Sequence, residues 1–401
     1  MMFGRTFHVF LRSKNLTACL QPLLVAKTAT LVRNLAACRR YTPGKRVSNN
    51  SAAEPSIKLK SWTFEVYTFG HVLVDSGLNV NVSPVDPIQY PEANMVFVHL
   101  VDNASPSQRN ATQGISENTP EMCECEVKYD GTNRLTVSAN SLQNEDTGTL
   151  HVQIEVPIKF NIDANMKKGG KIHVTSIDND HCKISTDKGE CRLTNLKCIS
   201  LNVDSKCGDV ISEKSLHSNG QIKVHGSGSV TADKLYGMQM DIHSESGSIS
   251  TKSVYQDVSN FSSDSGHIKL GNLHGSSQVR NETGTVTIDT LDGNLVTTTN
   301  TGDISVHITR HNDVALSSSK GNITVKLPES TGTRLELQGQ RLDIDERLQV
   351  TTDDDDPSKK GQSLKGVMGN SEGKLVKATT EQGVVHLQCQ SWFDTLQLSK
   401  Q

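Results

Sequence analysis

Glycine returns along the middle of this chain every 18 to 20 residues, and this spacing restricts the folds that the sequence can adopt. The series runs Gly170, Gly189, Gly208, Gly228, Gly247, Gly266, Gly284, Gly302 and Gly321. Two positions after these glycines an apolar residue recurs, at Cys191, Val210, Val230, Ile249, Ile268, Val286, Ile304 and Ile323. Such a period indicates a solenoid, in which each repeat buries its apolar face by stacking on its neighbours.

Two further apolar columns keep the same period. Seven positions after the glycine lie Leu196, Leu235, Val254, Leu273 and Leu291, and five before it lie Ile184, Val203, Ile242, Phe261, Val279 and Leu316. Three columns separated by polar turns predict an all-β fold, a single-chain parallel β-helix (β-solenoid) of about nine 18–20-residue coils over residues 166–338. We expect Ile304 to lie above Val286, with Gly302 stacked on Gly284 at a turn that favours glycine.

Residues 57–165 have a different pattern, with longer alternating stretches such as "NMVFVHLVD" and "LHVQIEVPIKFNID". They predict an N-terminal antiparallel or mixed β section that caps the first coil, because an uncovered solenoid end exposes unpaired backbone. The polar stretch from Asn103 to Pro120 is interpreted as a loop within it.

After Leu337 the period is lost. Residues 339–380 are interpreted as an acidic, polar insertion loop, and residues 381–401 as a closing β segment and tail containing "GVVHLQCQSW". The run from Asp353 to Asp356 is typical of a solvated loop; the alternative is a site for a cation or a basic partner.

The stretch "EVPIKFNIDANMKKGGKIHV", the serial [Ser/Thr]-x-Gly-x-[Ile/Val] coils and the closing "TTEQGVVHLQ" carry a resemblance. Together they resemble an adhesin-like family of bacterial and animal proteins of unknown function, over about Ile57 to Phe393, and the chain is most similar to an animal, mitochondrial member. The resemblance implies a β-solenoid and a mitochondrial address. It supplies no catalytic residue, because the shared motifs are structural.

The first 50 residues contain nine Lys or Arg and no Asp or Glu, scattered among Phe, Leu, Ala, Ser and Thr. This composition predicts a mitochondrial transit peptide over residues 1–41, with cleavage after Tyr41, and a linker over residues 42–56; the alternative is a merely basic start. The predicted localisation is the mitochondrion, in the matrix. Because the remaining chain is acidic, no nucleic-acid partner is expected, and the apolar run Leu20–Ala26 is too short for a transmembrane segment.

Two groups of cysteines are candidate sites. Cys182, Cys191, Cys198 and Cys207 lack the paired spacing of a structural zinc site, and Cys182 aligns with the apolar positions Leu201, Met240, Leu295 and Val314. They are therefore interpreted as core or turn residues. Cys123 and Cys125 would share one strand face, which leaves a metal or redox protein as an alternative.

Polar candidates lie two residues before the glycines, where stacking would align Glu245, Asp264 and Glu282. Splayed, solvated carboxylates are expected, because the Gly-Gly-x-Gly-x-Asp calcium repeat is absent. The stretch Gly226 to Val230, "GSGSV", falls in a turn and is a weak candidate for a phosphate cradle. Histidines recur along the chain, outside any catalytic motif, at His173, His225, His243, His267, His307 and His386.

From these patterns we predict a non-enzymatic scaffold or interaction protein with a protein partner, and no catalytic, cofactor-binding or metal residue is assigned. The alternative is a carbohydrate-active enzyme with carboxylates in a solenoid groove. With only 4% aromatic residues the chain has few rings for sugar stacking, which counts against that alternative.

Overall fold

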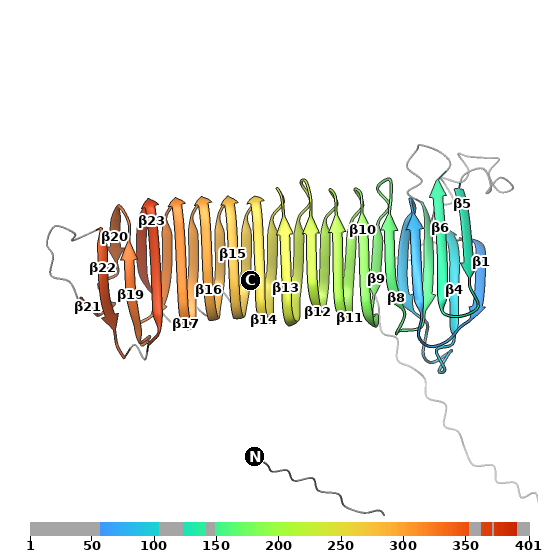
Figure 1. Cartoon of the computed structure of the whole chain (residues 1–401), viewed down its shortest axis with the longest axis horizontal. Helices are drawn as coiled ribbons and strands as arrows, with labels where there is room; N and C mark the ends of the chain where they lie inside the picture. Colours follow the sequence, from blue (N-terminus) through green and yellow to red (C-terminus); the bar gives the residue numbers. More distant parts are fainter. Residues whose placement is uncertain (1–56, 104–122, 142–148, 353–361, 371–372, 391–401) are drawn as a thin grey trace, which may run out of the picture. The chain divides into compact units, whose positions relative to one another are not determined.

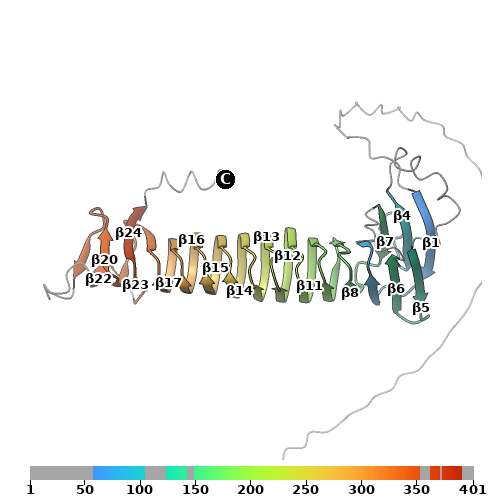
Figure 2. The same ribbon diagram turned by 90° about the horizontal axis from the view of Figure 1, so that it is seen from above.

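The computed structural model describes residues 57–103, 123–141, 149–352, 362–370 and 373–390. These residues form strands and turns, and the strands belong to one continuous sheet (Figures 1 and 2). The predicted all-β fold is confirmed. In this part of the chain no helix is long and apolar enough to cross a membrane. The predicted transit peptide and linker, most of the predicted loop after Asn103, and Asp353 to Asp356 lie outside the described residues.

The described strands fall into three groups along the chain. The first group is β1 (Ile57–Glu65), β2 (His71–Ser76), β3 (Asn79–Pro84), β4 (Met95–Asp102), β5 (Cys123–Tyr129), β6 (Arg134–Ser141), β7 (Leu150–Val156), β8 (Asn161–Met166), β9 (Ile172–Thr175) and β10 (Asp178–Thr186). The coil strands are β11 (Cys191–Ser205), β12 (Val210–Val224), β13 (Val230–Ser244), β14 (Ile249–Ser265), β15 (Ile268–Thr283), β16 (Val286–Thr301) and β17 (Ile304–Lys320). The last group is β18 (Ile323–Pro328), β19 (Thr333–Gln338), β20 (Arg341–Ile344), β21 (Val350–Thr352), β22 (Ser363–Met368), β23 (Leu375–Gln382) and β24 (Val384–Gln390).

Strands β11 to β17 each trace one bent coil and pair with the next in parallel. Ile304 is the register partner of Val286, as the repeat predicted. Phe261 and the other members of the predicted columns are buried, because the alternating β-branched and apolar residues of each coil face the same interior. The β-solenoid predicted from the period is confirmed.

The glycine corner is closed by backbone contacts between coils. A Cβ added to Gly302 would lie 2.0 Å from the carbonyl oxygen of Gly284, so no side chain fits there. Three residues before most of these glycines lies a small buried polar side chain; Gly228 is an exception, with His225 at that position. Ser244 Oγ donates to the Gly228 carbonyl at 3.2 Å and accepts from the Gly247 amide at 3.0 Å. Ser244, Asn281 and Ser318 thus satisfy buried backbone carbonyls at this corner, whereas the buried Thr299 hydroxyl has no hydrogen-bond partner among the described residues.

At the N-terminal end the chain order and the stacking order differ. Strand β2 pairs in parallel with both β6 and β8, and β3 pairs in parallel with both β7 and β9. The β2–β3 coil therefore lies inside the stack, between segments that follow it in sequence. Strands β1, β4 and β5 add antiparallel pairs at the end, so the pairing in this section is mixed, as expected.

The C-terminal end is interleaved in the same way. Strands β23 and β24 lie directly on β17 and β18, and β19 and β20 pair with their other edges. The interpretation of residues 339–380 as a loop is wrong for the described strands β20, β21 and β22 and for β23, which begins at Leu375. Strand β22 pairs antiparallel with β19 and buries Met368, whose value as a core residue was hidden by the polar sequence around it.

Candidate interaction surface

One outward-facing position forms a continuous column over eight consecutive coils. Each member is the register partner of the next. In order they are Asp178, Lys197, His217, Tyr236, Tyr255, His274, Asp292 and Arg310, and we call this set the outer column. Because parallel strands in register place equivalent residues side by side, the column is a row of neighbouring side chains on the surface.

The middle of the outer column is a stack of four rings. The centroids are 4.5 Å apart between His217 and Tyr236, 5.1 Å between Tyr236 and Tyr255, and 4.7 Å between Tyr255 and His274, with interplanar angles of 10° to 16°. Each ring covers the face of its neighbour, so only the ring edges remain accessible to a ligand. The phenol groups of Tyr236 and Tyr255 have no hydrogen-bond partner among the described residues.

Charged pairs close both ends of the stack. Asp178 accepts a hydrogen bond from Lys159 at 2.9 Å and lies 3.5 Å from Lys197. The Lys159 ammonium lowers the pKa of Asp178 below its usual value, against the effect of burial. At the other end Asp292 lies 3.4 Å from His274 Nδ1 and accepts from Arg310 at 2.5 Å. Because these ion pairs are partly exposed, each contributes little to the stability of the fold. Their main effect is to hold neighbouring side chains of the column together.

Two depressions flank the start of the stack. The first, of about 390 Å³, is lined by His217 and Tyr236 together with the exposed side chains Ile199 and Met238, which are 63% and 66% accessible. The second, of about 710 Å³, lies against the same two rings and is lined by Lys214, Ser215, Asp233, Lys234 and Lys252. The first depression therefore combines two exposed apolar side chains with the charged groups of Lys159, Asp178, Asp180 and Lys197, and the second combines three lysines with Asp233.

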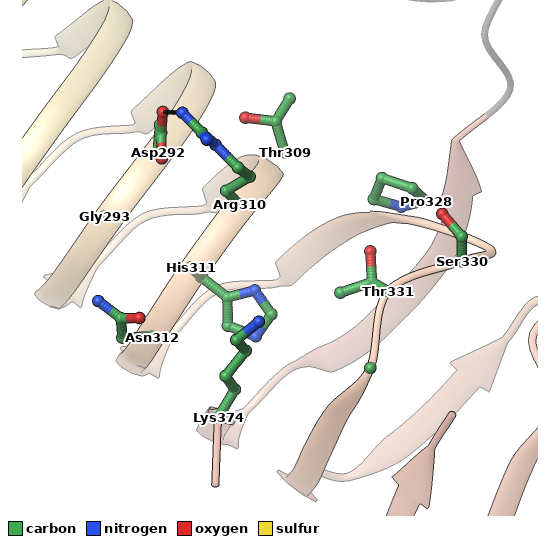
Figure 3. Close-up of a pocket in the computed structure, with 11 residues that line it drawn as sticks. Asp292, Gly293, Thr309, Arg310, His311, Asn312, Pro328, Ser330, Thr331 and Lys374 are labelled. Atoms are coloured by element: carbon green, nitrogen blue, oxygen red, sulfur yellow. Dashed lines mark hydrogen bonds and ion pairs between the residues drawn. The ribbon is translucent and has the colours of Figure 1, made fainter. Parts of the chain in front are cut away.

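A third depression, of about 510 Å³, lies at the far end of the outer column (Figure 3). Asp292 and Arg310 form one wall, His311 and Lys374 line another, and the turn with Ser330 and Thr331 closes it. His311 is buried and its Nε2 lies 2.9 Å from Thr333 Oγ1. Burial, and the nearby Lys374 ammonium, lower the pKa of His311.

The cysteines that the sequence marked as candidates lie mainly in the core. Cys191 and Cys182 are fully buried, and Cys182 pairs in register with Leu201, as the predicted alignment requires. Cys198 is buried against Ser218, whereas Cys207 is exposed. Burial raises the pKa of Cys191 to about 12. Among the described residues no group of three or more His, Cys, Asp or Glu side chains is placed to hold a metal ion.

Cys123 and Cys125 share one face of β5, as predicted. Cys123 is buried and Cys125 is half-buried, and both are free thiols. Burial, and then the neighbouring Cys123, raise the pKa of Cys125 to about 11. A thiol with a raised pKa is a weak nucleophile and a weak metal ligand at neutral pH.

The predicted carboxylate column has two different environments. Asp264 and Glu282 are exposed, as expected for solvated side chains. Glu245 instead accepts from the Gly226 amide at 2.8 Å and lies 3.1 Å from His225 Nδ1. Those two contacts lower the pKa of Glu245. The Gly226 amide is thus bound to a carboxylate of its own chain, which weakens the stretch Gly226 to Val230 further as a phosphate cradle.

The other histidines make local contacts. His173, His243 and His267 lie at hydrogen-bond distance from threonine or serine hydroxyls, and His386 lies 3.0 Å from Asp343. His307 is buried. The structure brings neither these five histidines nor His225 into the outer column.

Sequence reasoning missed the outer column, although its signal is present in the repeat. Its members fall eight residues after successive glycines, or nine in the case of His217. Aromatic residues make up only 4% of the chain. This low overall content does not reveal that Tyr236 and Tyr255 occupy the same position in consecutive repeats. A search of the outward positions for recurring residue types could have found it.

Solved structures of proteins described as adhesins or cell adhesion proteins match most of the chain. Proteins described as a "putative adhesin" come from Parabacteroides merdae, at 12% identity over 82% of this chain and 96% of that one with a TM-score of 0.35, and from Parabacteroides distasonis, at 12% over 83% and 97% with a TM-score of 0.32. A "putative cell adhesion protein" from Clostridium sporogenes matches at 11% over 82% and 99%, with a TM-score of 0.20.

A match to a family model over the solenoid shows the family of this chain. The model of the Toastrack DUF4097 family matches residues 124–387, which include every coil strand from β11 to β17 and strands β18 to β23, but neither β2 nor β3. The adhesin-like resemblance of the repeat and the β-solenoid of the structure agree with this match. The chain therefore belongs to the Toastrack DUF4097 family of solenoid proteins.

Proposed function

We propose that this protein is a non-enzymatic mitochondrial scaffold that binds a protein partner along the outer column. The observation that carries the proposal is the row of exposed apolar side chains beside the stacked rings. Ile199 on β11, Met238 on β13 and Val258 on β14 are 63%, 66% and 43% accessible. Large apolar side chains that gather on a surface, next to aromatic edges and a polar rim, are typical of protein interfaces.

The rigidity of the support favours the same function. The column is held by in-register backbone pairing from Asp178 to Arg310, so its side chains are fixed at the coil spacing. A partner that binds such a surface does not have to pay for ordering it, which increases the affinity obtained from a given contact area.

The carboxylates beside the column do not favour the alternative of a carbohydrate-active enzyme. Asp178 and Asp292 are paired with Lys159 and Arg310. Burial alone would raise the pKa of Asp233, but hydrogen bonds from Lys252 and the Lys214 amide lower it below its usual value. A glycosidase acid needs the opposite shift, because it must hold a proton at neutral pH.

Proximity labelling from the full chain in cells tests the proposal. The double variant Ile199→Lys and Met238→Lys should lose labelling of the partner by tenfold or more, which corresponds to about 1.4 kcal/mol of binding free energy. Val296→Lys is the matched control, because Val296 is 48% accessible and lines none of the three depressions. Equal partner labelling by the wild type, the control and the double variant would refute the proposed surface.

The mitochondrial address needs its own test. Residues 1–50 fused to a fluorescent reporter should direct it to the matrix, and replacing the nine Lys or Arg of this segment with Gln should leave the reporter diffuse. A diffuse or secreted wild-type fusion would disprove the address and leave the interaction surface unaffected.

A further inference from the structure

The outer column ends at Arg310 because the next layer of the stack is built from other segments. Strand β17 continues into the next layer in two separate pieces. Ile304 to His307 pair with Ile323 to Lys326 of β18, and Asp313 to Lys320 pair with Leu375 to Gln382 of β23. On that side, residues 308–312 have no strand partner among the described residues.

The depression of about 510 Å³ occupies the place of the missing segment (Figure 3). After β18 the chain turns away through Ser330 to Gly332, and it returns at Lys374 before β23. A Cβ added to Gly332 would lie 1.8 Å from the Asn370 carbonyl oxygen, so this turn is packed against the returning chain. The two segments form walls and leave the edge of Thr309 to Asn312 open between them.

The open edge is basic. Arg310 is paired with Asp292 on one side only, and its side chain is 80% accessible. Lys374 lines the opposite wall, and its charge contributes to the lowered pKa of the neutral, buried His311. Ser330 and Thr331 place hydroxyl groups around the same space, whereas the Thr309 hydroxyl donates to the Leu291 carbonyl at 2.8 Å. A carboxylate that entered it would meet cationic groups and hydrogen-bond donors.

The column itself indicates which charge belongs in the missing position. Asp178 is followed by Lys197, and Asp292 by Arg310, so each basic member lies next to an acidic one. Arg310 has its acidic neighbour on the β16 side and an empty position on the other. An acidic residue in that position would repeat the pairing that the chain already uses.

We propose that an extended acidic segment of a partner protein binds this edge as an added strand, with its backbone along residues 308–312 and a carboxylate on Arg310. Main-chain pairing supplies part of the affinity in such additions, and side-chain pockets supply the specificity. The inference rests on the proposed scaffold function. It adds a second contact, beyond the stacked rings, at which the partner segment is acidic.

A synthetic peptide from the chain itself is the probe. The sequence Ile-Asp-Thr-Leu-Asp-Gly-Asn-Leu corresponds to residues 288–295, which contain the natural neighbour of Arg310. Fluorescence anisotropy with the full chain and up to about 1 mM labelled peptide should show saturable binding. A peptide with Asn in place of its second Asp, and the protein variant Arg310→Gln, should each weaken it by about tenfold. Arg280→Gln, an exposed change outside the depression, is the control.

Three results would contradict an acidic partner segment as the occupant of this edge. Absence of saturable binding, or equal binding by wild type and Arg310→Gln, would overturn the inference. It would also fail if inorganic phosphate displaced the peptide at the peptide's own concentration, since the site would then take any small anion. A dimer in sedimentation experiments that Arg310→Gln dissociates would overturn it too, by identifying a second copy of this chain as the occupant.

The Ile199→Lys and Met238→Lys variant separates the two proposals. Its loss of partner labelling tests the scaffold function, and it should bind the peptide as the wild type does, because neither residue lines this depression. Loss of peptide binding in that variant would contradict a separate site at Arg310.

Discussion

Gly302 lies directly against Gly284, so close that a Cβ on Gly302 would be 2.0 Å from the Gly284 carbonyl oxygen. The two glycines lie at corresponding corners of consecutive coils, and Gly302 has a φ of 146°, which side chains rarely adopt. The backbone therefore requires glycine at this corner, and the register that stacks the two corners also pairs the buried residues Val286 and Ile304.

Replacing Gly302 with Ala should destabilise the solenoid more than a glycine replacement in an open turn. Backbone strain of about 1–3 kcal/mol adds to an overlap with the Gly284 carbonyl that costs a similar amount. Gly131→Ala is the control, because Gly131 also has a positive φ, of 78°, and has nothing within 4 Å of the added Cβ. Urea unfolding followed by circular dichroism measures both, and equal midpoints would show that the corner can relax.

Tyr255 stacks on both sides, and its removal should cost more than the loss of its hydroxyl. Tyr255→Ala removes the contacts with Tyr236 and His274, worth about 0.5–1.5 kcal/mol each. Tyr255→Phe keeps both contacts and should stay within about 0.5 kcal/mol of the wild type. Thermal unfolding of the two variants distinguishes a stack that stabilises the coils from rings that merely lie in register.

The thiols should react in the order of their exposure and pKa. At pH 8 the thiolate fraction of Cys125, with a pKa of about 11, is roughly a hundredfold smaller than that of a thiol with the ordinary value of 9.0. Mass spectrometry after brief iodoacetamide treatment should find Cys207 modified first and Cys191 protected until the protein unfolds. Rapid modification of Cys125 at pH 8 would contradict the shift.

The same sample tests the metal or redox alternative for Cys123 and Cys125. Elemental analysis of the purified protein should return no stoichiometric metal, and denaturing alkylation should modify both thiols. Stoichiometric zinc or copper that is lost in the variant with Ser at both positions would revive a metal site on β5.

His311 should make the protein less stable at mildly acidic pH. Its pKa is lowered in the folded state, mainly by burial, whereas the unfolded chain has the ordinary value of 6.5. Below about pH 6.5 the unfolded state therefore binds more protons, and stability falls until the pH passes the lowered pKa. The slope due to one histidine is at most about 1.4 kcal/mol per pH unit.

His311→Gln should flatten this part of the stability profile between pH 7 and pH 5. His267→Gln is the control, since His267 is exposed and lies outside the core. If the profile of His311→Gln followed the wild type at every pH, the buried imidazole would not be the group that titrates.

The middle of the fold could be predicted from the sequence because the coils repeat. The alignment of Cys182 with Leu201, and of Val286 with Ile304, needed only the glycine period and the preference of apolar residues for the interior. The ends could not be predicted in this way. Strands β2 and β23 pair with segments far along the chain, so no local period reports their position.

The candidate surface could be predicted only in part from the sequence. The positions of Tyr236 and Tyr255 follow from the repeat, but their stacking depends on side-chain orientation, which the spacing alone does not determine. The depression at Arg310 could not be foreseen, because it exists only where β18 and β23, from different parts of the chain, leave residues 308–312 uncovered.

Site-specific photocrosslinking in cells tests the central claim most directly. A photoreactive phenylalanine analogue placed at Met238, beside the stacked rings, should form a covalent adduct with a defined partner, and the same analogue at the exposed control Val296 should not. A single additional band that appears with Met238 alone is the predicted result. Adducts of equal yield at both positions, or none at Met238, would contradict a partner-binding surface along the outer column.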